Sequence, residues 1–367
     1  MSTSNRKERP TNDRKTIGQI MDENGVGRRR FLKYCAGITA LMAMPPGMTA
    51  AFAQQLRAAR RPTIIYMPFQ ECTGCLESLT RSFAPSLESL MFETVSLDYN
   101  HTLQAAAGDA AEAARHEAME EAWGEYILIC DGSIPTKMDG IYGASAGHSF
   151  VDQLHEAAEG AAAIVAVGVC ASFGGVGAAY PNPTGAVGVS EIIKNKPIIN
   201  VPGCPPIPEV MTGTLVSFLA SGVPDLDNHL RPKAFFGNTI HDRCYRRRFY
   251  DTGLFAESFD DEGARNGWCL YKLGCRGPTT YNACATIKWN GGTSWPVESG
   301  HGCLGCSEPN FWDQGGFYEP VTSKLFNDTG QIAGAAAAGV AVGAAAALAA
   351  NRRKKKLSGQ AEKETSS

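Results

Sequence analysis

The residues of this chain best suited to chemistry are its twelve cysteines, together with a histidine that lies close to one of them. Cys35 stands apart near the N-terminus, and the cysteines that remain are odd in number. An odd number fits metal ligation better than complete disulfide pairing. We therefore interpret the cysteines of the body as ligands of metal clusters, in three groups.

The first group has four cysteines from three distant parts of the chain. Two form a C-x2-C motif and the others follow short apolar runs: Cys72, Cys75, Cys170 and Cys204. Four thiolates suit a [4Fe–4S] cluster. Because C-x2-C motifs also occur in zinc sites and redox-active dithiols, zinc is the alternative for this group taken alone.

The second group combines one imidazole with three thiolates, as His241-x2-Cys244 and Cys269-x5-Cys275. These four donors can hold a [4Fe–4S] cluster, and a neutral imidazole in place of a thiolate tends to raise its potential. Zinc held by three cysteines and one histidine explains this group nearly as well when it is taken alone.

The third group has only three cysteines, Cys284, Cys303 and Cys306. Three thiolates suit a [3Fe–4S] cluster, which lacks one iron corner. Pro296 lies between them in the sequence and offers no ligand atom. Cys130 is the one cysteine left over, and we interpret it as a buried strand residue.

An α/β fold is needed to bring the first group together. Short apolar runs alternate with helix-like stretches over residues 54–236, which predicts a parallel sheet in the βαβ manner. The carboxyl ends of parallel strands share one edge, where loops converge into a ligand crevice. The predicted strands cover residues 64–67, 126–129, 163–167 and 198–201, and the predicted helices include 105–123 and 151–161.

Residues 237–325 have a different character, because they are rich in Cys, Gly, Trp, Tyr and Pro and show little periodicity. A segment of this length without regular structure needs another source of stability. Ligand binding to buried metal clusters couples directly to folding. We therefore predict a second, irregular domain that its clusters stabilise.

Residues 1–53 have the features of an export signal. A basic string, Arg28-Arg29-Arg30-Phe31-Leu32-Lys33, precedes an apolar stretch that ends in Ala51-Phe52-Ala53. This order is typical of a signal peptide, and the basic string resembles the twin-arginine signal. That route carries proteins already folded in the cytoplasm, where thiols stay reduced and can take up metal. A basic helix lying on a membrane is the alternative.

Residues 331–350 carry no charge and are long enough to cross a hydrocarbon core as a helix. The tail, residues 351–367, begins with a basic run, which places the C-terminus in the cytoplasm. A flexible Ala/Gly linker is the alternative for the uncharged stretch. Small residues recur four apart and would let another transmembrane helix approach: Ala335, Gly339, Gly343 and Ala347.

From about Arg61 to Tyr318 the chain resembles the small subunit of [NiFe] hydrogenases. The strings that carry the resemblance are Glu71-Cys72-Thr73-Gly74-Cys75, Pro202-Gly203-Cys204-Pro205-Pro206, His241-Asp242-Arg243-Cys244, Trp268-Cys269-Leu270-Tyr271 with Leu273-Gly274-Cys275, Gly277-Pro278 with Tyr281-Asn282 and Cys284, and Gly300-His301-Gly302-Cys303-Leu304-Gly305-Cys306-Ser307-Glu308-Pro309-Asn310-Phe311-Trp312. The two ends are similar to those of membrane-bound members.

The resemblance implies a flavodoxin-like N-terminal domain and three clusters in a row. The first group would hold a proximal [4Fe–4S] cluster, nearest a nickel–iron centre that splits hydrogen in a separate large subunit. The third would hold a medial [3Fe–4S] cluster with Pro296 near the vacant corner, and the second a distal [4Fe–4S] cluster. Oxygen-tolerant members carry two further cysteines where this chain has Gly74 and Gly175, which implies the standard, oxygen-sensitive type.

The resemblance and the two ends together imply a protein at the inner membrane, with its body facing the periplasm. Its electrons would pass to a cytochrome b or a similar quinone-linked membrane protein. Two other classes compete with this hypothesis. One is the small subunit of a related quinone reductase, which matches only the proximal part, and the other is a secreted, non-enzymatic protein held by disulfides or zinc.

Charged residues add three further expectations. The net charge of −3 gives no broad electrostatic basis for nucleic-acid binding. Glu71 and Asp131 lie where they could bond to ligands or carry protons, although Asp131 followed by Gly132 also fits a plain turn. Residues 246–248 are three arginines, which we interpret as a solvated charge run rather than a docking patch for an acceptor.

Overall fold

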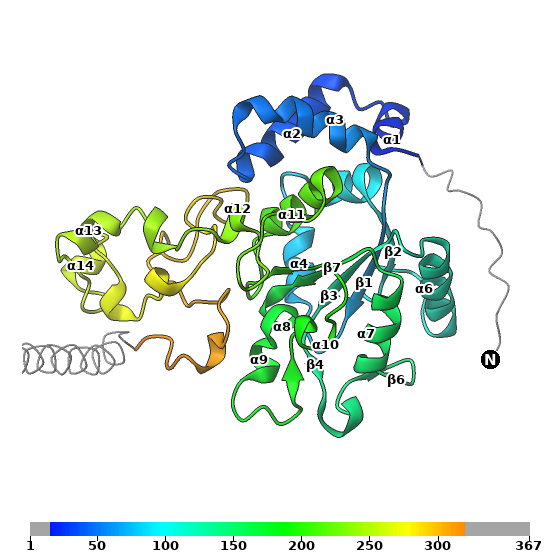
Figure 1. The fold of residues 1–367 in the computed structure, drawn as a ribbon. Helices are drawn as coiled ribbons and strands as arrows, with labels where there is room; N and C mark the ends of the chain where they lie inside the picture. Colours follow the sequence, from blue (N-terminus) through cyan, green and yellow to red (C-terminus); the bar gives the residue numbers. More distant parts are fainter. Residues whose placement is uncertain (1–14, 320–367) are drawn as a thin grey trace, which may run out of the picture. The chain divides into compact units, whose positions relative to one another are not determined.

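A computed structural model describes residues 15–319 of the chain. At its centre lies a five-stranded sheet in the order β2-β1-β3-β7-β9, in which every pairing is parallel (Figure 1). In chain order this is 2-1-3-4-5, the order of flavodoxin-like doubly wound sheets. The strands are β1 (Thr63–Pro68), β2 (Ser96–Asn100), β3 (Ile127–Asp131), β7 (Ala163–Val167) and β9 (Ile198–Val201).

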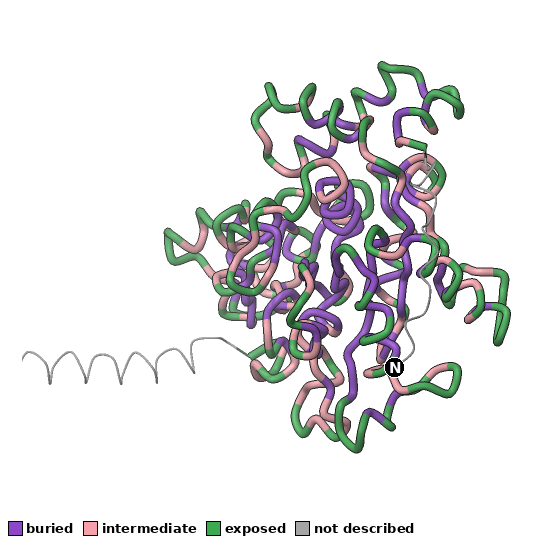
Figure 2. Tube along the Cα trace, turned by 45° about the vertical axis from the view of Figure 1, so that its right-hand side comes forward, coloured by how far each residue is buried: buried purple, intermediate pink, exposed green. Residues whose placement is uncertain are grey.

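Both faces of the sheet are covered, as a parallel sheet requires. Alternate residues of β1 enter two cores: Ile64 and Tyr66 pack on one side, and Ile65 and Met67 on the other. The first side is covered by α4 (Gly74–Thr80) and α11 (Pro208–Ser221), and the second by α6 (Asp109–Glu121) and α7 (Phe150–Glu159). The buried residues concentrate along these strands (Figure 2).

The remaining elements of the sheet-containing part are short. Helices α5 (Leu87–Ser89), α8 (Gly168–Phe173), α9 (Gly175–Ala178), α10 (Val189–Ile192) and α12 (Lys233–Phe236) lie in its connections, with a π-turn at Leu90–Thr94 and a 3-10 turn at Lys137–Gly140. Two small antiparallel pairs are β4 (Ile134–Pro135) with β8 (Ala186–Val187), and β5 (Ala144–Ser145) with β6 (His148–Ser149).

The four predicted strands are confirmed, and the structure adds β2. The predicted helix 105–123 is shorter than expected, because α6 begins at Asp109 after Gly108, whose φ of +57° does not continue a helix. The predicted helix 151–161 corresponds to α7.

Residues 15–58, most of which belong to the predicted export signal, are folded and packed on the sheet-containing part. They form α1 (Ile17–Glu23), α2 (Arg28–Leu41), a 3-10 turn (Pro46–Met48) and α3 (Thr49–Ala58) (Figure 1). Phe31, Cys35 and Phe52 are buried in the same core as α11, and Tyr34 Oη lies 3.3 Å from Thr94 Oγ1. The predicted end of the export signal, residue 53, lies inside α3.

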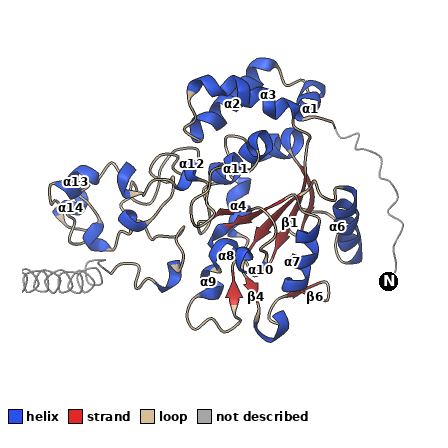
Figure 3. Cartoon of the chain, viewed as in Figure 1, coloured by secondary structure: helices blue, strands red, loops and turns tan. Residues whose placement is uncertain are grey.

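Residues 237–319 are mainly loops (Figure 3). They contain α13 (Arg247–Asp251), α14 (Glu262–Arg265) and 3-10 turns at His241–Arg243, Tyr271–Leu273, Gly277–Thr279 and Phe311–Asp313. Their core is small and includes Cys275 next to Trp295 and Val297. Within residues 15–319 no helix is long and apolar enough to cross a membrane, and the predicted span at 331–350 lies outside that range.

Candidate metal-cluster sites

The four cysteines of the first group meet at the carboxyl edge of the sheet. Cys72 and Cys75 follow β1, Cys170 lies in α8 after β7, and Cys204 follows β9. Burial raises the pKa of Cys75, Cys170 and Cys204, and nearby thiolates raise it further, since Cys170 acts on Cys75 and Cys204, and Cys72 on Cys170. Thiolates that interact in this way must lie close together. The structure therefore brings the four thiols together at this edge of the sheet.

Glycine leaves room for the sulfur atoms of this group. A Cβ on Gly175 would lie 2.4 Å from Cys170 Sγ and 2.7 Å from its Cα. At Gly74 a Cβ would meet only Cys72 Sγ, at 3.2 Å. Gly175 also has a φ of +52°, which disfavours any other residue.

Gly175→Ala is expected to lower the amount of iron bound at the first group and to destabilise the protein by about 1–3 kcal/mol, because the new methyl group overlaps Cys170. Gly74→Ala is the matched control and should retain nearly full iron. Iron analysis and thermal unfolding of both variants check this. Equal losses in the two variants would contradict it.

Asp131 is a partner of the first group. Its carboxylate is 2% exposed and accepts hydrogen bonds from Tyr66 Oη, at 2.9 Å, and from the Cys75 thiol. Burial raises the pKa of Asp131 to about 6. The turn at Gly132 is present, with a φ of +91°, but a turn alone does not account for this side chain.

Glu71 also faces the crevice. Its Oε1 accepts a hydrogen bond from Thr73 Oγ1 at 3.3 Å, whereas its Oε2 is buried without a partner. Burial raises the pKa of this carboxyl. A buried, unpartnered acceptor fits a role in holding or passing a proton.

The second group lies in the loop-rich part. Burial raises the pKa of Cys244 and Cys269, and the Cys275 thiolate contributes to both shifts. His241 Nε2 is buried and has no hydrogen-bond partner, and its ring packs against Tyr250 at 4.5 Å between centroids. Burial, followed by the charge of Arg247, lowers the pKa of His241. His241 Nε2 is thus available as a metal ligand.

The interpretation of residues 246–248 as a solvated run is wrong for the first of them. Arg246 is 5% exposed, and its guanidinium donates to the Trp268 carbonyl at 2.8 Å. Burial raises the pKa of Cys244, Cys269 and Cys275, and the charge of Arg246 opposes that rise in all three. Three consecutive arginines gave no sign that one of them turns inward toward the second group.

Arg246→Gln is expected to make the potential of a cluster bound at the second group more negative by on the order of 50 mV, because a nearby positive charge favours the reduced form. Arg248→Gln is the matched control, since Arg248 is exposed and its guanidinium carbon lies over the Phe249 ring, 4.7 Å from the centroid. A redox titration followed by EPR measures both shifts. A shift in the control as large as in Arg246→Gln would rule out a specific effect.

The three cysteines of the third group are half-buried. Burial raises the pKa of all three thiols, and the Cys306 and Cys284 thiolates both act on Cys303. Trp289 donates a hydrogen bond to Cys284. Pro296 is exposed, between the buried side chains of Trp295 and Val297, which pack beside Cys284 and Cys303.

Two contacts connect the three groups in a row. The Cys204 amide donates a hydrogen bond to Cys306, and the two thiols are close enough for Cys306 to raise the pKa of Cys204. At the other side of the third group, the Cys303 amide donates to Cys275 Sγ at 3.3 Å. The third group therefore lies between the first and the second.

The remaining cysteines do not join these groups. All twelve are free thiols, which removes the disulfide alternative. Cys130 is fully buried in β3, as predicted, and Cys35 is buried in α2. Among the described residues, no three His, Cys, Asp or Glu side chains converge as a single bound metal ion would require.

The donor chemistry fits iron–sulfur clusters. Burial raises the pKa of Cys269 to about 11 and that of Cys284 to about 12. A thiolate without a cation beside it is therefore unfavourable in these surroundings. Bound iron removes that penalty, since it takes the thiolate form as its ligand. The free nitrogen of His241 is satisfied in the same way.

Comparisons with known proteins agree with this chemistry. A family model for the C-terminal part of the NiFe/NiFeSe hydrogenase small subunit matches residues 236–319. Another, described as NADH ubiquinone oxidoreductase, 20 Kd subunit, matches residues 72–218. The second match is limited to the sheet-containing part, as expected for the related quinone reductases.

Full-length relatives are more specific. The uptake hydrogenase small subunit of Azotobacter vinelandii is 47% identical over 330 residues, which are 89% of this chain and 92% of the relative. The periplasmic [NiFe] hydrogenase small subunit 1 of Nitratidesulfovibrio vulgaris is 50% identical over 299 residues, 80% of this chain and 94% of the relative. A solved chain of the reduced, active Ni-Fe-Se hydrogenase of Desulfomicrobium baculatum has a TM-score of 0.67 at 36% identity, covering 71% of this chain and all of that one.

A parallel α/β domain followed by a cysteine-rich loop domain defines an electron-transferring oxidoreductase subunit. This chain belongs to the NiFe hydrogenase small-subunit family. Its activity is therefore that of a hydrogenase, with electron transfer as its share of the work and the large subunit as its partner.

Proposed function

We propose that this chain conducts electrons from the nickel–iron site of the large subunit to a membrane acceptor, through clusters held by its three cysteine groups. Cys72, Cys75, Cys170 and Cys204 would hold a proximal [4Fe–4S] cluster. Cys284, Cys303 and Cys306 would hold a medial [3Fe–4S] cluster. His241, Cys244, Cys269 and Cys275 would hold a distal [4Fe–4S] cluster. The observation that carries the proposal is the pair of contacts, from Cys204 to Cys306 and from Cys303 to Cys275, that puts the groups in a row.

The clusters supply one-electron redox chemistry when they are bound, and the chain sets the conditions. Hydrogen bonds from the Cys204 and Cys303 amides lie between successive groups and bring their sulfur atoms close. Burial raises the pKa of Cys303 and Cys306 in the middle of the path. Arg246 adds positive charge at the second group, which favours arrival of the electron there.

The experiment is EPR of the anaerobically purified complex with its large subunit, on three variants that each remove one donor group: Cys72→Ser, Cys306→Ser and His241→Ala. Each variant should lose or alter the signal of one cluster and leave the other two. Loss of all signals in every variant, with the protein still folded, would contradict separate sites.

The first group is the one that we place against the large subunit. Cys72 and Cys204 are exposed, whereas the cysteines of the third group are half-buried. Hydrogen exchange tests this placement, because residues 72–75 should be protected when the large subunit is bound. Equal exchange in the free and bound protein would contradict it.

We propose that the complex works in the direction of hydrogen oxidation, is exported by the twin-arginine route and is anchored by residues 331–350. Support comes from the relative named an uptake hydrogenase subunit and the one named periplasmic. The acceptor would be a cytochrome b or a similar quinone-linked protein. Gly74 and Gly175 support an oxygen-sensitive enzyme of the standard type.

Two measurements test the location. Changing Arg28 and Arg29 together to lysine should retain the precursor in the cytoplasm, because the export signal is lost. Purification of the membrane complex should yield haem b in a membrane-spanning partner. Export of the double variant at the normal level, or absence of haem and of any integral partner, would overturn the corresponding part of the proposal.

A further inference from the structure

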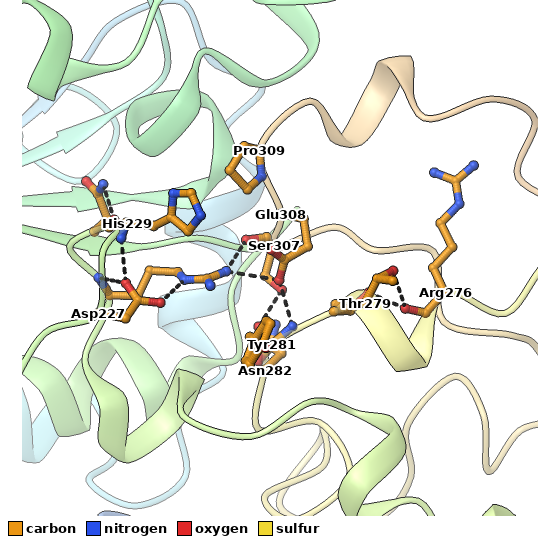
Figure 4. Close-up of polar contacts among 12 residues, drawn as sticks. Asp227, His229, Arg276, Thr279, Tyr281, Asn282, Ser307, Glu308 and Pro309 are labelled. Atoms are coloured by element: carbon orange, nitrogen blue, oxygen red, sulfur yellow. Dashed lines mark hydrogen bonds and ion pairs between the residues drawn. The ribbon is translucent and has the colours of Figure 1, made fainter. Parts of the chain in front are cut away.

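A buried arginine in the sheet-containing part reaches the loop that carries the third cysteine group. Arg231 is 2% exposed and lies just before α12. Its Nε donates to Asp227 Oδ2 at 2.8 Å, within its own loop. Its Nη1 donates to Glu308 Oε1 at 2.9 Å and to the Ser307 carbonyl at 3.1 Å. One side chain thus connects segments 77 residues apart in sequence (Figure 4).

The same carboxylate holds a third segment. Glu308 Oε1 accepts a hydrogen bond from the Tyr281 amide at 2.6 Å, and Ser307 Oγ donates to the Tyr281 carbonyl at 2.8 Å (Figure 4). The Tyr281 ring lies 5.4 Å from the Arg231 guanidinium carbon. The arginine, its two carboxylate partners and Tyr281 are defined here as the Arg231 clamp.

The Arg231 clamp adjoins two donors of the third group. Cys306 directly precedes Ser307, and Cys284 is three positions after Tyr281. Cys306 is also the residue that accepts the hydrogen bond from the Cys204 amide. The position of the Ser307–Glu308 segment therefore determines how close the third group lies to the first.

We propose that Arg231 is a positioning residue for electron transfer between the proximal and medial clusters, an inference that rests on the proposed function. Clusters bound at the first and third groups would supply the one-electron chemistry, with hydrogen oxidation as the source of the electron. Arg231 acts through Ser307 and Glu308 by fixing Cys306 against Cys204. It touches neither cluster itself.

The chemistry of the clamp calls for arginine. One planar guanidinium bonds two carboxylates and a carbonyl at once, whereas a lysine ammonium cannot reproduce this fork. Neutral methionine would leave Asp227 and Glu308 without their cation in a buried site. Arg231→Lys should weaken the bonds that hold Ser307 and Glu308, and Arg231→Met should remove them.

Arg115 provides the matched control. It is 1% exposed and pairs with Glu112 and Glu156, each at 3.0 Å, on the side of the sheet that α6 and α7 cover. Arg115→Met removes a buried charge, and Arg115→Lys keeps the charge but removes the guanidinium. Neither change touches a cysteine group.

The experiment compares these variants as complexes with the large subunit, purified without oxygen. It measures the medial [3Fe–4S] EPR signal per oxidised complex, the broadening of that signal, which reports disorder at the third group, and thermal unfolding. Arg231→Met should reduce the signal by about 10-fold, and Arg231→Lys should keep iron but change the broadening. Both Arg115 variants should lower thermal stability and leave the signal and broadening unchanged.

Wild-type signal and broadening in Arg231→Met would overturn the inference. If Arg231→Met cannot be purified, Arg231→Lys and Glu308→Gln test the inference in its place. Unchanged broadening of the [3Fe–4S] signal in both variants would overturn the inference. A wild-type complex without any [3Fe–4S] signal would instead overturn the proposed function, and the inference with it, whatever the variants do.

Discussion

Cys204→Ser is expected to lower hydrogen-dependent dye reduction by at least about 100-fold, because it removes both a ligand and a link in the electron path. Cys204 lies among the thiols of the first group, and its amide bonds Cys306 of the third. A serine hydroxyl is a poor ligand for cluster iron and would break the path at its first step. Steady-state activity of the anaerobic complex measures the loss.

Cys130→Ala is the control for that variant. Cys130 is fully buried in β3 and lies outside all three groups. Its replacement removes a small buried side chain, so some thermal stability should be lost while activity stays within about twofold of wild type. Activity of Cys204→Ser close to that of Cys130→Ala would show that Cys204 holds no cluster.

Removal of iron is expected to unfold residues 237–318 while the parallel sheet persists. The loop-rich part has a small core, and its longest helix, α13, has five residues. Bound metal can contribute on the order of 10 kcal/mol to the folding of such a part. The sheet instead has continuous cores on both faces.

Hydrogen exchange after chelation, with thiols kept reduced, resolves the two parts. Amides of β3 and β7 should stay protected, and those around Cys269–Cys275 and Cys303–Cys306 should exchange freely. Unchanged protection in the loop-rich part after complete loss of iron would mean that its packing, and not its ligands, holds it together.

The sheet and its crevice were predictable because local patterns determine them. The apolar runs at β1, β3, β7 and β9 are buried on both faces, and parallel strands bring their carboxyl ends to one edge. β2 was missed because Ser96–Asn100 is polar and only partly buried at the edge of the sheet.

Other features depend on contacts between distant residues, which no local pattern records. Three adjacent arginines look alike, yet only Arg246 is buried against the second group. The apolar residues of the predicted export signal could be identified from the sequence, but their packing with α11 could not. The link from Cys204 to Cys306 and the Arg231 clamp join segments that only the folded chain brings together.

The most direct test is quantitative iron and acid-labile sulfide analysis, with EPR, of the natively isolated complex kept free of oxygen. We predict roughly eleven iron atoms and a similar amount of sulfide in this protein, with a [3Fe–4S] signal when oxidised. Stoichiometric zinc without inorganic sulfide, in a preparation that retains its large subunit, would contradict the account.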